Sequence, residues 1–315
     1  MRKTMLLVGL LAYGISFGMA QCDPGTPVTA NAENSSTHNT LLVSTAWLEE
    51  HLKDQSLVLI HVGEKKDYEA GHIPGAQFLP YMDISTPHGK GLTLELPAVD
   101  ELRSTLERLG ISNNSRIVVY FGRDWVSPTT RVFFTLDFMG LGDQTSLLDG
   151  GLPAWQAEGR PVTQDIKKIQ SGSLTPRARR DVVVDAAWVK SHLNNHSTVI
   201  VDARAPDFYS GKKSGGMPRS GHIPGAVNIP YSSLVNDNNK LKDPEALQQI
   251  FKAAGVKPDS HLVAYCHIGQ QATLVYFVAK YLGYPVSLYD GSFEDWSGQQ
   301  DLPLATGGSA PSGPQ

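Results

Sequence analysis

The sequence predicts an α/β protein of two tandem domains, each a parallel sheet flanked by helices. Three observations lead to this prediction. The chain of 315 residues is long enough for two ordinary domains, which typically contain about 100–150 residues each. Several segments recur in the same order in the two halves, and in each half short apolar runs alternate with helical patterns. Strands that alternate with helices at this spacing are typical of a parallel sheet covered on both faces.

The internal repeat consists of four matched segments. The hexapeptide Gly-His-Ile-Pro-Gly-Ala occurs unchanged at residues 71–76 and 221–226. The other three matches are similar but not identical, and they pair residues 43–52 with 184–193, 117–120 with 262–265, and 148–155 with 289–296. The separation of the matched segments along the chain is far greater than the period of a solenoid repeat, which is roughly 20–50 residues. The matches therefore indicate duplicated domains.

Each copy begins with the same two predicted elements. A short helix, near residues 44–52 in one copy and 185–193 in the other, precedes an apolar run at residues 57–62 or 198–203. The run has the length and composition of a buried strand.

A second strand and a longer helix follow in both copies. The strands are predicted at residues 117–120 and 262–265. The helices are predicted to end at Gly140 and Gly283, because glycine is a natural residue just past a helix C-terminus. We therefore expect the following parts: a first domain at 41–162, a solvated and locally basic linker at 163–180, a second domain at 181–306, and a disordered tail at 307–315.

The first 20 residues have the pattern of a secretory signal peptide. Arg2 and Lys3 precede an apolar run, and Gly18 and Ala20 supply the small residues that a signal peptidase accepts. Residues 21–40, which are rich in Pro, Thr, Asn and Ser, are predicted to form a flexible leader. We expect cleavage after Ala20 and an exported protein of the periplasm or cell envelope.

Cys22 raises a second possibility for the N-terminus, namely a lipid anchor on this residue. Gln21 disfavours the anchor, because a lipobox usually has a small residue in that position. A soluble exported chain is therefore the preferred expectation, with the lipoprotein as its alternative.

Composition and charge restrict the classes of partner. Hydrophobic residues make up 41% of the chain and charged residues 18%, which is typical of a globular protein. The formal net charge of −4 argues against a nucleic-acid partner, because no overall excess of basic residues is available to neutralise phosphates.

Cys266, one of only two cysteines, lies in a segment that reads as strand, tight loop and helix. Open parallel sheets bind ligands at the carboxyl ends of their strands, which is where this thiol stands. A loop over residues 266–271 that leads into a helix would aim backbone N–H groups at the sulfur, favouring the thiolate and binding a small oxyanion. The predicted anion loop comprises His267, Ile268, Gly269, Gln270 and Gln271.

A buried structural cysteine is the alternative interpretation of this thiol. A disulfide to Cys22 would fix little structure, because Cys22 lies in the flexible leader. A metal site is weakly supported, since Cys266 and His267 are adjacent and no second ligand pair has zinc-like spacing. We predict neither a metal nor any other cofactor.

Together these segments resemble the tandem-domain rhodaneses, the family of thiosulfate and 3-mercaptopyruvate sulfurtransferases. The resemblance rests on the two Gly-His-Ile-Pro-Gly-Ala segments, on Asp202-Ala203-Arg204, on the loop 266–271 and on residues 289–296, and it covers about residues 41–306. It implies two rhodanese-like domains and a sulfurtransferase in which Cys266 carries a persulfide. Thiosulfate is the expected donor, and cyanide, a thiol or a protein cysteine is the expected acceptor.

The resemblance also implies roles for single residues of the second copy. Arg204 matches a family position that contacts the anionic donor, with a surface ion pair as the alternative. The N–H groups of residues 267–271 would hold the negative charge of the persulfide.

The first copy departs from the pattern of the second. Phe121 takes the place of Cys266, His61 that of Asp202 and Gly63 that of Arg204, and the following loop, residues 122–130, is expected to be longer. The first domain therefore cannot form a persulfide. By resemblance it should pack against the active domain and wall the cleft, which Arg123, Asp124 and Trp125 are expected to face.

Departures from the family loops bear on the substrate. Thiosulfate-type loops usually carry cations after the cysteine, whereas His267 and Ile268 follow Cys266, and the Cys-Gly-Ser-Gly of mercaptopyruvate-type loops is also absent. Residues 211–220 would either supply the missing positive charge or form an ordinary solvated loop; their basic residues are Lys212, Lys213 and Arg219. We expect thiosulfate in preference to 3-mercaptopyruvate.

Two other classes of function are weighed against sulfur transfer. A phosphatase with this fold would need a loop one residue longer, closed by an arginine, and the loop here ends at Gln271. A non-catalytic persulfide carrier or binding module remains an alternative, because it would also keep Cys266.

Overall fold

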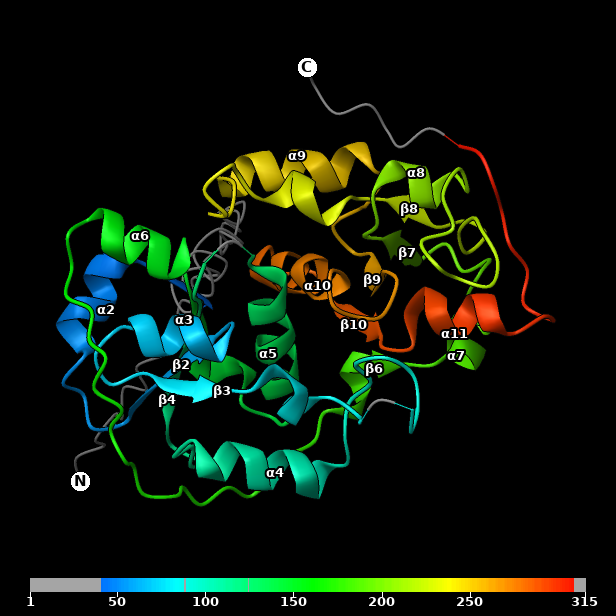
Figure 1. Ribbon diagram of the computed structural model, residues 1–315. Helices are drawn as coiled ribbons and strands as arrows, with labels where there is room; N and C mark the ends of the chain where they lie inside the picture. The colour runs from blue at the N-terminus through cyan, green and yellow to red at the C-terminus, as the bar shows by residue number, and fades with distance from the viewer. Residues whose placement is uncertain (1–40, 88, 124, 309–315) are drawn as a thin grey trace, which may run out of the picture.

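The computed structural model describes residues 41–308, apart from His88 and Asp124. The predicted signal peptide, the leader with Cys22 and most of the predicted tail lie outside the described residues. The described chain forms two five-stranded sheets (Figure 1). Every strand pair within the two sheets is parallel. The predicted fold class, two tandem α/β domains, is therefore confirmed.

The first domain has the strand order β1-β5-β4-β2-β3. Its elements are β1 (Leu42–Val43), α2 (Thr45–His51), β2 (Leu57–Val62), α3 (Lys65–Ala70), β3 (Gln77–Leu79), η1 (Tyr81–Ile84), α4 (Val99–Arg108), β4 (Arg116–Phe121), α5 (Ser127–Phe138), η2 (Gly142–Gln144), β5 (Thr145–Leu148) and α6 (Gly151–Ala157).

The second domain repeats this topology with the order β6-β10-β9-β7-β8. Its elements are η3 (Arg180–Val182), β6 (Val183–Val184), α7 (Ala186–Ser191), β7 (Thr198–Asp202), α8 (Pro206–Tyr209), β8 (Val227–Asn228), η4 (Tyr231–Leu234), α9 (Pro244–Ala253), β9 (His261–Tyr265), α10 (Ala272–Tyr281), β10 (Val286–Tyr289) and α11 (Ser292–Gly298).

Local sequence explains the matched starts and ends of the helices. The Ser44 hydroxyl accepts from the Trp47 amide at the start of α2, and the Asp185 carboxylate accepts from the Trp188 amide at the start of α7. Such side-chain caps satisfy N–H groups that have no partner within the helix. Gly140 and Gly283, which follow α5 and α10, have φ of +84° and +85°. These left-handed conformations end the helices as predicted.

Side chains alternate between two cores along the central strands. In β9, Leu262 and Ala264 belong to an apolar cluster shared by the two domains, and so does Cys266 just beyond the strand. Val263 and Tyr265 point to the opposite face, where they join a separate cluster with residues of α7 and α11. This is the two-residue period of a strand buried on both faces. It turns the thiol toward the first domain.

Helices α5 and α10 pack against each other between the two sheets (Figure 1). Phe133 meets Phe277 edge to face with ring centres 4.8 Å apart, and the Thr130 and Thr273 hydroxyls are 2.8 Å apart. Because α10 directly follows the loop after Cys266, this interface places the first domain against the predicted anion loop.

The predicted linker lies along the first domain before it enters the second. The Gly172 amide donates to the Glu107 carbonyl, and the Leu174 side chain is buried.

Within the part of the chain that the structure describes, no helix has both the length and the apolar character needed to cross a membrane.

Candidate active site

Cys266 directly follows β9, the central strand of the second sheet. The pairing of β7 with β9 ends at Asp202 and Tyr265, so Cys266 lies just outside the ladder. Its amide donates to the Ser292 hydroxyl at 3.2 Å, and its carbonyl accepts from the Phe293 amide at 3.0 Å. Both partners belong to the start of α11, which therefore fixes the backbone of the cysteine.

The loop after Cys266 offers unpaired backbone donors. Among the described residues, no protein acceptor is hydrogen-bonded to the N–H groups of residues 267–271. Gly269 has φ of +77°, a left-handed conformation that lets the chain turn before α10 starts at Ala272. A run of free amides that leads into a helix is suited to binding an anion.

Ser292 supports the cysteine from a strained conformation. Its φ is +53° although it is not glycine, and its side chain is completely buried. The equivalent residue of the first copy is Gly151, with φ of +56°. A serine at a position that favours glycine indicates that its hydroxyl is needed there, and the hydroxyl bonds the Cys266 amide.

The first domain also holds the loop through Gln270. Tyr81 donates its hydroxyl to Gln270 Oε1 at 3.2 Å, and Gln270 Nε2 donates to Ser127 Oγ at 3.3 Å. Burial raises the pKa of Tyr81, so the phenol stays protonated and able to donate. The loop that follows Cys266 is thus positioned by both domains.

A cavity of about 330 Å³ lies over the sulfur. Its walls are mostly apolar and come from both domains; they are formed by Trp125, Phe208, Gly215, Met217, Cys266, His267, Ile268, Gln270 and Gln271. Trp125 is 46% exposed and comes from the first domain, in agreement with the expected position at the cleft. Cys266 itself is 0% exposed, so the thiol lies at the base of the cavity.

The imidazole of His267 forms part of this wall in its neutral form. Its ring packs edge-on against Phe208, with ring centres 4.7 Å apart. Burial lowers the pKa of His267, and the nearby positive charge of Arg204 lowers it further. His267 therefore does not replace the cation that thiosulfate-type loops usually carry.

Arg204 lies outside the lining of this cavity. Its guanidinium donates to both oxygens of Asp202 and to the Gly221 carbonyl, and it lies 3.9 Å over the Phe293 ring. The side chain is 1% exposed, so the pair is a buried one and not the surface ion pair considered from the sequence. The donor contact expected of Arg204 stays a prediction.

The basic residues of the segment 211–220 do not line the cavity either. Arg219 donates to four backbone carbonyls at the end of α11 and just beyond it, and Lys213 forms an ion pair with Asp207 at 2.9 Å. Gly215 and Met217 are the residues of this segment that reach the cavity wall.

The first copy differs from the expectation in its loop. The sequence predicted a longer loop over residues 122–130, but α5 begins at Ser127 and only residues 122–126 separate it from β4. The prediction was wrong because Pro128, which suits the first turn of a helix, adds that turn to α5. Arg123 pairs with Asp67, and Asp124 lies outside the described residues.

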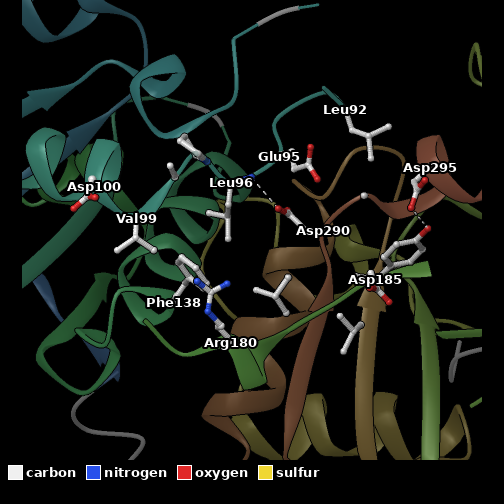
Figure 2. A pocket seen from close by; sticks show the side chains of 16 residues that line it. Leu92, Glu95, Leu96, Val99, Asp100, Phe138, Arg180, Asp185, Asp290 and Asp295 are labelled. Carbon is white, nitrogen blue, oxygen red and sulfur yellow. Dashed lines mark hydrogen bonds between the residues drawn. The ribbon is translucent and has the colours of Figure 1, made fainter. Parts of the chain in front are cut away.

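A second cavity, of about 560 Å³, lies between the domains and contains none of the predicted site residues (Figure 2). Its wall includes Asp290, which accepts from the Leu96 amide at 2.9 Å, and Tyr289, which donates to Asp295. Among the described residues, no group of three or more His, Cys, Asp or Glu side chains is arranged to hold a metal ion.

Sequence reasoning found the cysteine and its loop but missed their supports. Five of the predicted residues line the cavity, and Gly269 turns the loop beneath them. Ser292 and Tyr81 were not predicted. Ser292 had one sequence signal, since the repeat pairs Asp-Gly-Ser at 290–292 with Asp-Gly-Gly at 149–151.

Comparisons with known proteins match both domains of the chain. A family model described as the Rhodanese-like domain matches residues 44–158 and 185–299. The chain is 34% identical over 289 residues to the sulfur carrier protein TtuD of Thermus thermophilus, covering 86% of this chain and 98% of that protein.

Two further relatives are named as sulfurtransferases. A "Putative thiosulfate sulfurtransferase" of Saccharopolyspora erythraea is 32% identical over 84% of this chain and 95% of its own length. A "Probable 3-mercaptopyruvate sulfurtransferase" of Pseudomonas aeruginosa is 33% identical over 76% of this chain and 86% of its own length.

Solved structures share the fold at lower sequence identity. YnjE superposes with a TM-score of 0.78 at 24% identity, covering 86% of this chain and 69% of that chain. An anaerobic ergothioneine biosynthesis enzyme from Chlorobium limicola superposes with a TM-score of 0.75 at 23% identity, covering 86% and 71%.

Proposed function

Because the chain belongs to the rhodanese-like domain family of sulfurtransferases, we propose that it moves a sulfane sulfur from thiosulfate to a thiophilic acceptor through a persulfide on Cys266. The observation that carries the proposal is the juxtaposition of a thiol at the base of a cavity with a run of free amide N–H groups over residues 267–271. A nucleophile and an anion site coincide there.

In the first half-reaction the Cys266 thiolate attacks the outer sulfur of thiosulfate. A new S–S bond forms to the cysteine, the S–S bond of thiosulfate breaks, and sulfite leaves with the electron pair. The product is an anionic persulfide on Cys266. Its charge is stabilised by the N–H groups of the loop, because these donors are already in place and need no reorganisation.

In the second half-reaction a nucleophilic acceptor takes the outer sulfur. With cyanide, the carbon attacks this sulfur, thiocyanate forms and the thiolate of Cys266 is restored. The enzyme alternates between thiolate and persulfide, so the kinetics are expected to be ping-pong.

Thiosulfate is proposed in preference to 3-mercaptopyruvate, a preference that rests on the names of the relatives and not on a cation in the site. Several relatives are named as thiosulfate sulfurtransferases and one as a 3-mercaptopyruvate sulfurtransferase. The relative named as a sulfur carrier supports a second candidate, in which the persulfide is delivered to a protein thiol. The apolar wall formed by Trp125, Phe208 and Met217 favours such an organic acceptor.

Steady-state assays with each donor, using cyanide as acceptor, test the proposal. Thiocyanate should form with thiosulfate, and intact-mass spectrometry should show one added sulfur on the protein. The Cys266→Ser variant should show neither, because a hydroxyl cannot become a persulfide. Turnover of this variant at the wild-type rate would contradict the mechanism, whereas sulfur loading without turnover on cyanide would favour the carrier.

We also propose that the protein is exported to the periplasm or cell envelope. Support comes from the sequence of residues 1–20 alone, which lie outside the described residues. N-terminal sequencing and cell fractionation test it: a soluble chain that starts at Gln21 is expected. A membrane-held chain that starts at an acylated Cys22 would establish the lipoprotein instead, and an uncleaved cytoplasmic chain would contradict export.

A further inference from the structure

Arg131 is a buried cation that the first domain inserts beside the loop of the second. It lies on α5 and is 0% exposed. Its guanidinium donates to the Gly269 carbonyl at 3.3 Å, to the Asp290 carboxylate and to the Leu94 carbonyl. Since an unpaired buried cation is strongly unfavourable, these three acceptors are needed to keep the side chain there.

Arg131 remains charged in this position. Burial by itself would lower its pKa, but the Asp290 carboxylate reverses this effect and raises the pKa above the ordinary value. The thiolate form of Cys266 is among the other charges that raise it. The guanidinium donates to the carbonyl of Gly269, three residues after the cysteine that bears the sulfur.

The contact with Gly269 is close enough to set the direction of its peptide group. A Cβ atom at Gly269 would lie 2.7 Å from the Asp290 carbonyl oxygen and 3.2 Å from Arg131 Nη1. The carbonyl of Gly269 points to Arg131, and in a planar trans peptide the next N–H, that of Gln270, points the opposite way. An anion-binding loop needs this arrangement, with carbonyls turned outward and amides inward.

Each copy makes an equivalent carboxylate contact with the opposite domain. Asp290 of the second copy accepts from the Leu96 amide at 2.9 Å (Figure 2). Its repeat equivalent, Asp149 of the first copy, accepts from the Leu241 amide at 3.2 Å. Each aspartate thus accepts a backbone N–H from the opposite domain, and this contact needs no arginine.

By contrast, an arginine at the position of Arg131 occurs in only one of the two copies. The residue of α10 that is equivalent to Arg131 is Leu274, because each stands nine residues before the matched glycine that follows its helix, Gly140 or Gly283. Arg131 contacts the loop of the copy whose strand is followed by Cys266, whereas the equivalent Leu274 is a fully buried apolar side chain that carries no charge. A cation that is present only on the side of the cysteine indicates a role in its chemistry.

We propose that Arg131 is a positioning residue for sulfur transfer: it holds the Gly269 carbonyl so that the loop amides face the persulfide anion, and it adds positive charge beside them. The active site is then completed by the first domain. This inference rests on the proposed function, which supplies the anion.

The test uses the full chain with Arg131→Met combined with Asp290→Asn. The double substitution removes the cation without leaving a buried carboxylate unpaired. Because the loop is misplaced for the transition state, kcat for sulfur transfer from thiosulfate to cyanide should fall by about 10- to 100-fold, with KM for thiosulfate nearly unchanged. Alkylation of Cys266 by iodoacetamide should slow in parallel.

Lys280→Met is the matched control. Lys280 pairs with Asp137 at 2.9 Å, so it too joins α10 to α5 across the interface, but within the described part of the chain it does not bond the loop. Its kcat and alkylation rate should match those of the wild type. An equal fall in kcat in this control would show that loosening the interface is sufficient, which overturns the proposal.

Wild-type values of kcat and alkylation rate in the folded double variant would also overturn it. If that variant does not fold, Arg131→Lys, which keeps the charge but not the two-pronged donor, is measured against the same criteria. Failure of the proposed function is distinguishable, because a wild-type protein that gains no sulfur from thiosulfate or mercaptopyruvate refutes sulfur transfer. The alkylation rates then still decide whether Arg131 positions the loop.

Discussion

Phe121 and Cys266 stand at equivalent positions of the two domains, and both belong to the core cluster that the domains share. The pairing of the two central strands extends one residue further in the first copy than in the second. In the first copy the Gly122 amide donates to the Val62 carbonyl, which extends the pairing of β2 with β4 through Phe121. In the second copy the pairing ends at Tyr265, so the amide of His267 is left free.

This difference predicts that a cysteine at position 121 is not sufficient for a persulfide site. Phe121→Cys in a Cys266→Ser background should gain no sulfur from thiosulfate. The Gly122 amide is already bonded, and Pro128, in the added first turn of α5, has no N–H to offer. Intact-mass spectrometry after treatment with thiosulfate measures the result.

The control is the parent Phe121→Cys protein, which should gain one sulfur per chain through Cys266. Two added sulfurs in the parent, or one in the double variant, would show that the amide directly after the thiol, which Gly122 uses in the strand pairing, need not be free.

Two substitutions of Ser292 separate the effect of its hydrogen bond on kcat from the effect of its strained backbone on stability. Ser292→Gly and Ser292→Ala both remove the hydroxyl that accepts from the Cys266 amide, so each should lower kcat by roughly fivefold, the equivalent of about 1 kcal/mol. Glycine adopts φ of +53° without strain and alanine does not. The glycine variant should therefore be the more stable of the two by about 1 kcal/mol.

Urea unfolding and steady-state kinetics of the two variants measure these effects. Equal stability of the glycine and alanine variants would show that the left-handed conformation relaxes in the alanine variant. Unchanged kcat in both would remove Ser292 from the support of Cys266.

Much of the fold could be predicted because its signals are local. Caps such as Ser44 and Asp185, the glycines after α5 and α10, and the apolar runs all lie within a few residues of the elements that they define. The position of Cys266 followed from its place at the end of one such run.

The supports of the site could not be predicted because they join residues far apart in the sequence. Arg131 and Gly269 are 138 positions apart, and Tyr81 and Gln270 are 189 apart. In the sequence Arg131 looks like an ordinary polar residue of a helix, and only the packing of the domains buries it.

Arg204 and Asp202 form a buried pair, so Arg204→Ala should first affect stability. Removing the cation leaves the Asp202 carboxylate, which is 0% exposed, without a positive charge beside it, although it still accepts from the Tyr265 hydroxyl. The loss should lower the free energy of unfolding by roughly 3–5 kcal/mol. Chemical denaturation measures this loss, and KM for thiosulfate in the folded variant tests the predicted donor contact.

Lys190→Ala provides the surface comparison. Lys190 pairs with Asp301 at 3.0 Å, but both side chains are largely exposed. Its loss should change stability by less than about 1 kcal/mol. An Arg204→Ala variant as stable as this control would mean that Asp202 is rescued by another partner. An unchanged KM would assign Arg204 to the buried pair alone.

His61 occupies the position of Asp202 in the first copy and gives the fold a dependence on pH. Its ring is 0% exposed, and Nδ1 lies 3.1 Å from the Tyr120 hydroxyl. Burial lowers the pKa of His61 from 6.5 to about 4, and the neighbouring His72 lowers it while Asp67 opposes the change. The folded protein therefore keeps this imidazole neutral over a range in which the unfolded chain protonates it.

The sign of the effect follows from the depressed pKa of the folded state. Above pH 6.5, His61 is neutral in both the folded and the unfolded protein, and its contribution to stability is fully present. As the pH falls from 6.5 toward 4, only the unfolded chain binds a proton at His61, so the free energy of unfolding decreases. The full loss is roughly 3 kcal/mol for a difference of this size in pKa. His61→Gln, which keeps a polar partner for Tyr120 but does not titrate, should flatten the curve. Urea unfolding of both proteins between pH 7 and about pH 4.5 measures the difference. Parallel stability curves for the two proteins would mean that His61 is not held neutral, and that other groups cause any acid sensitivity.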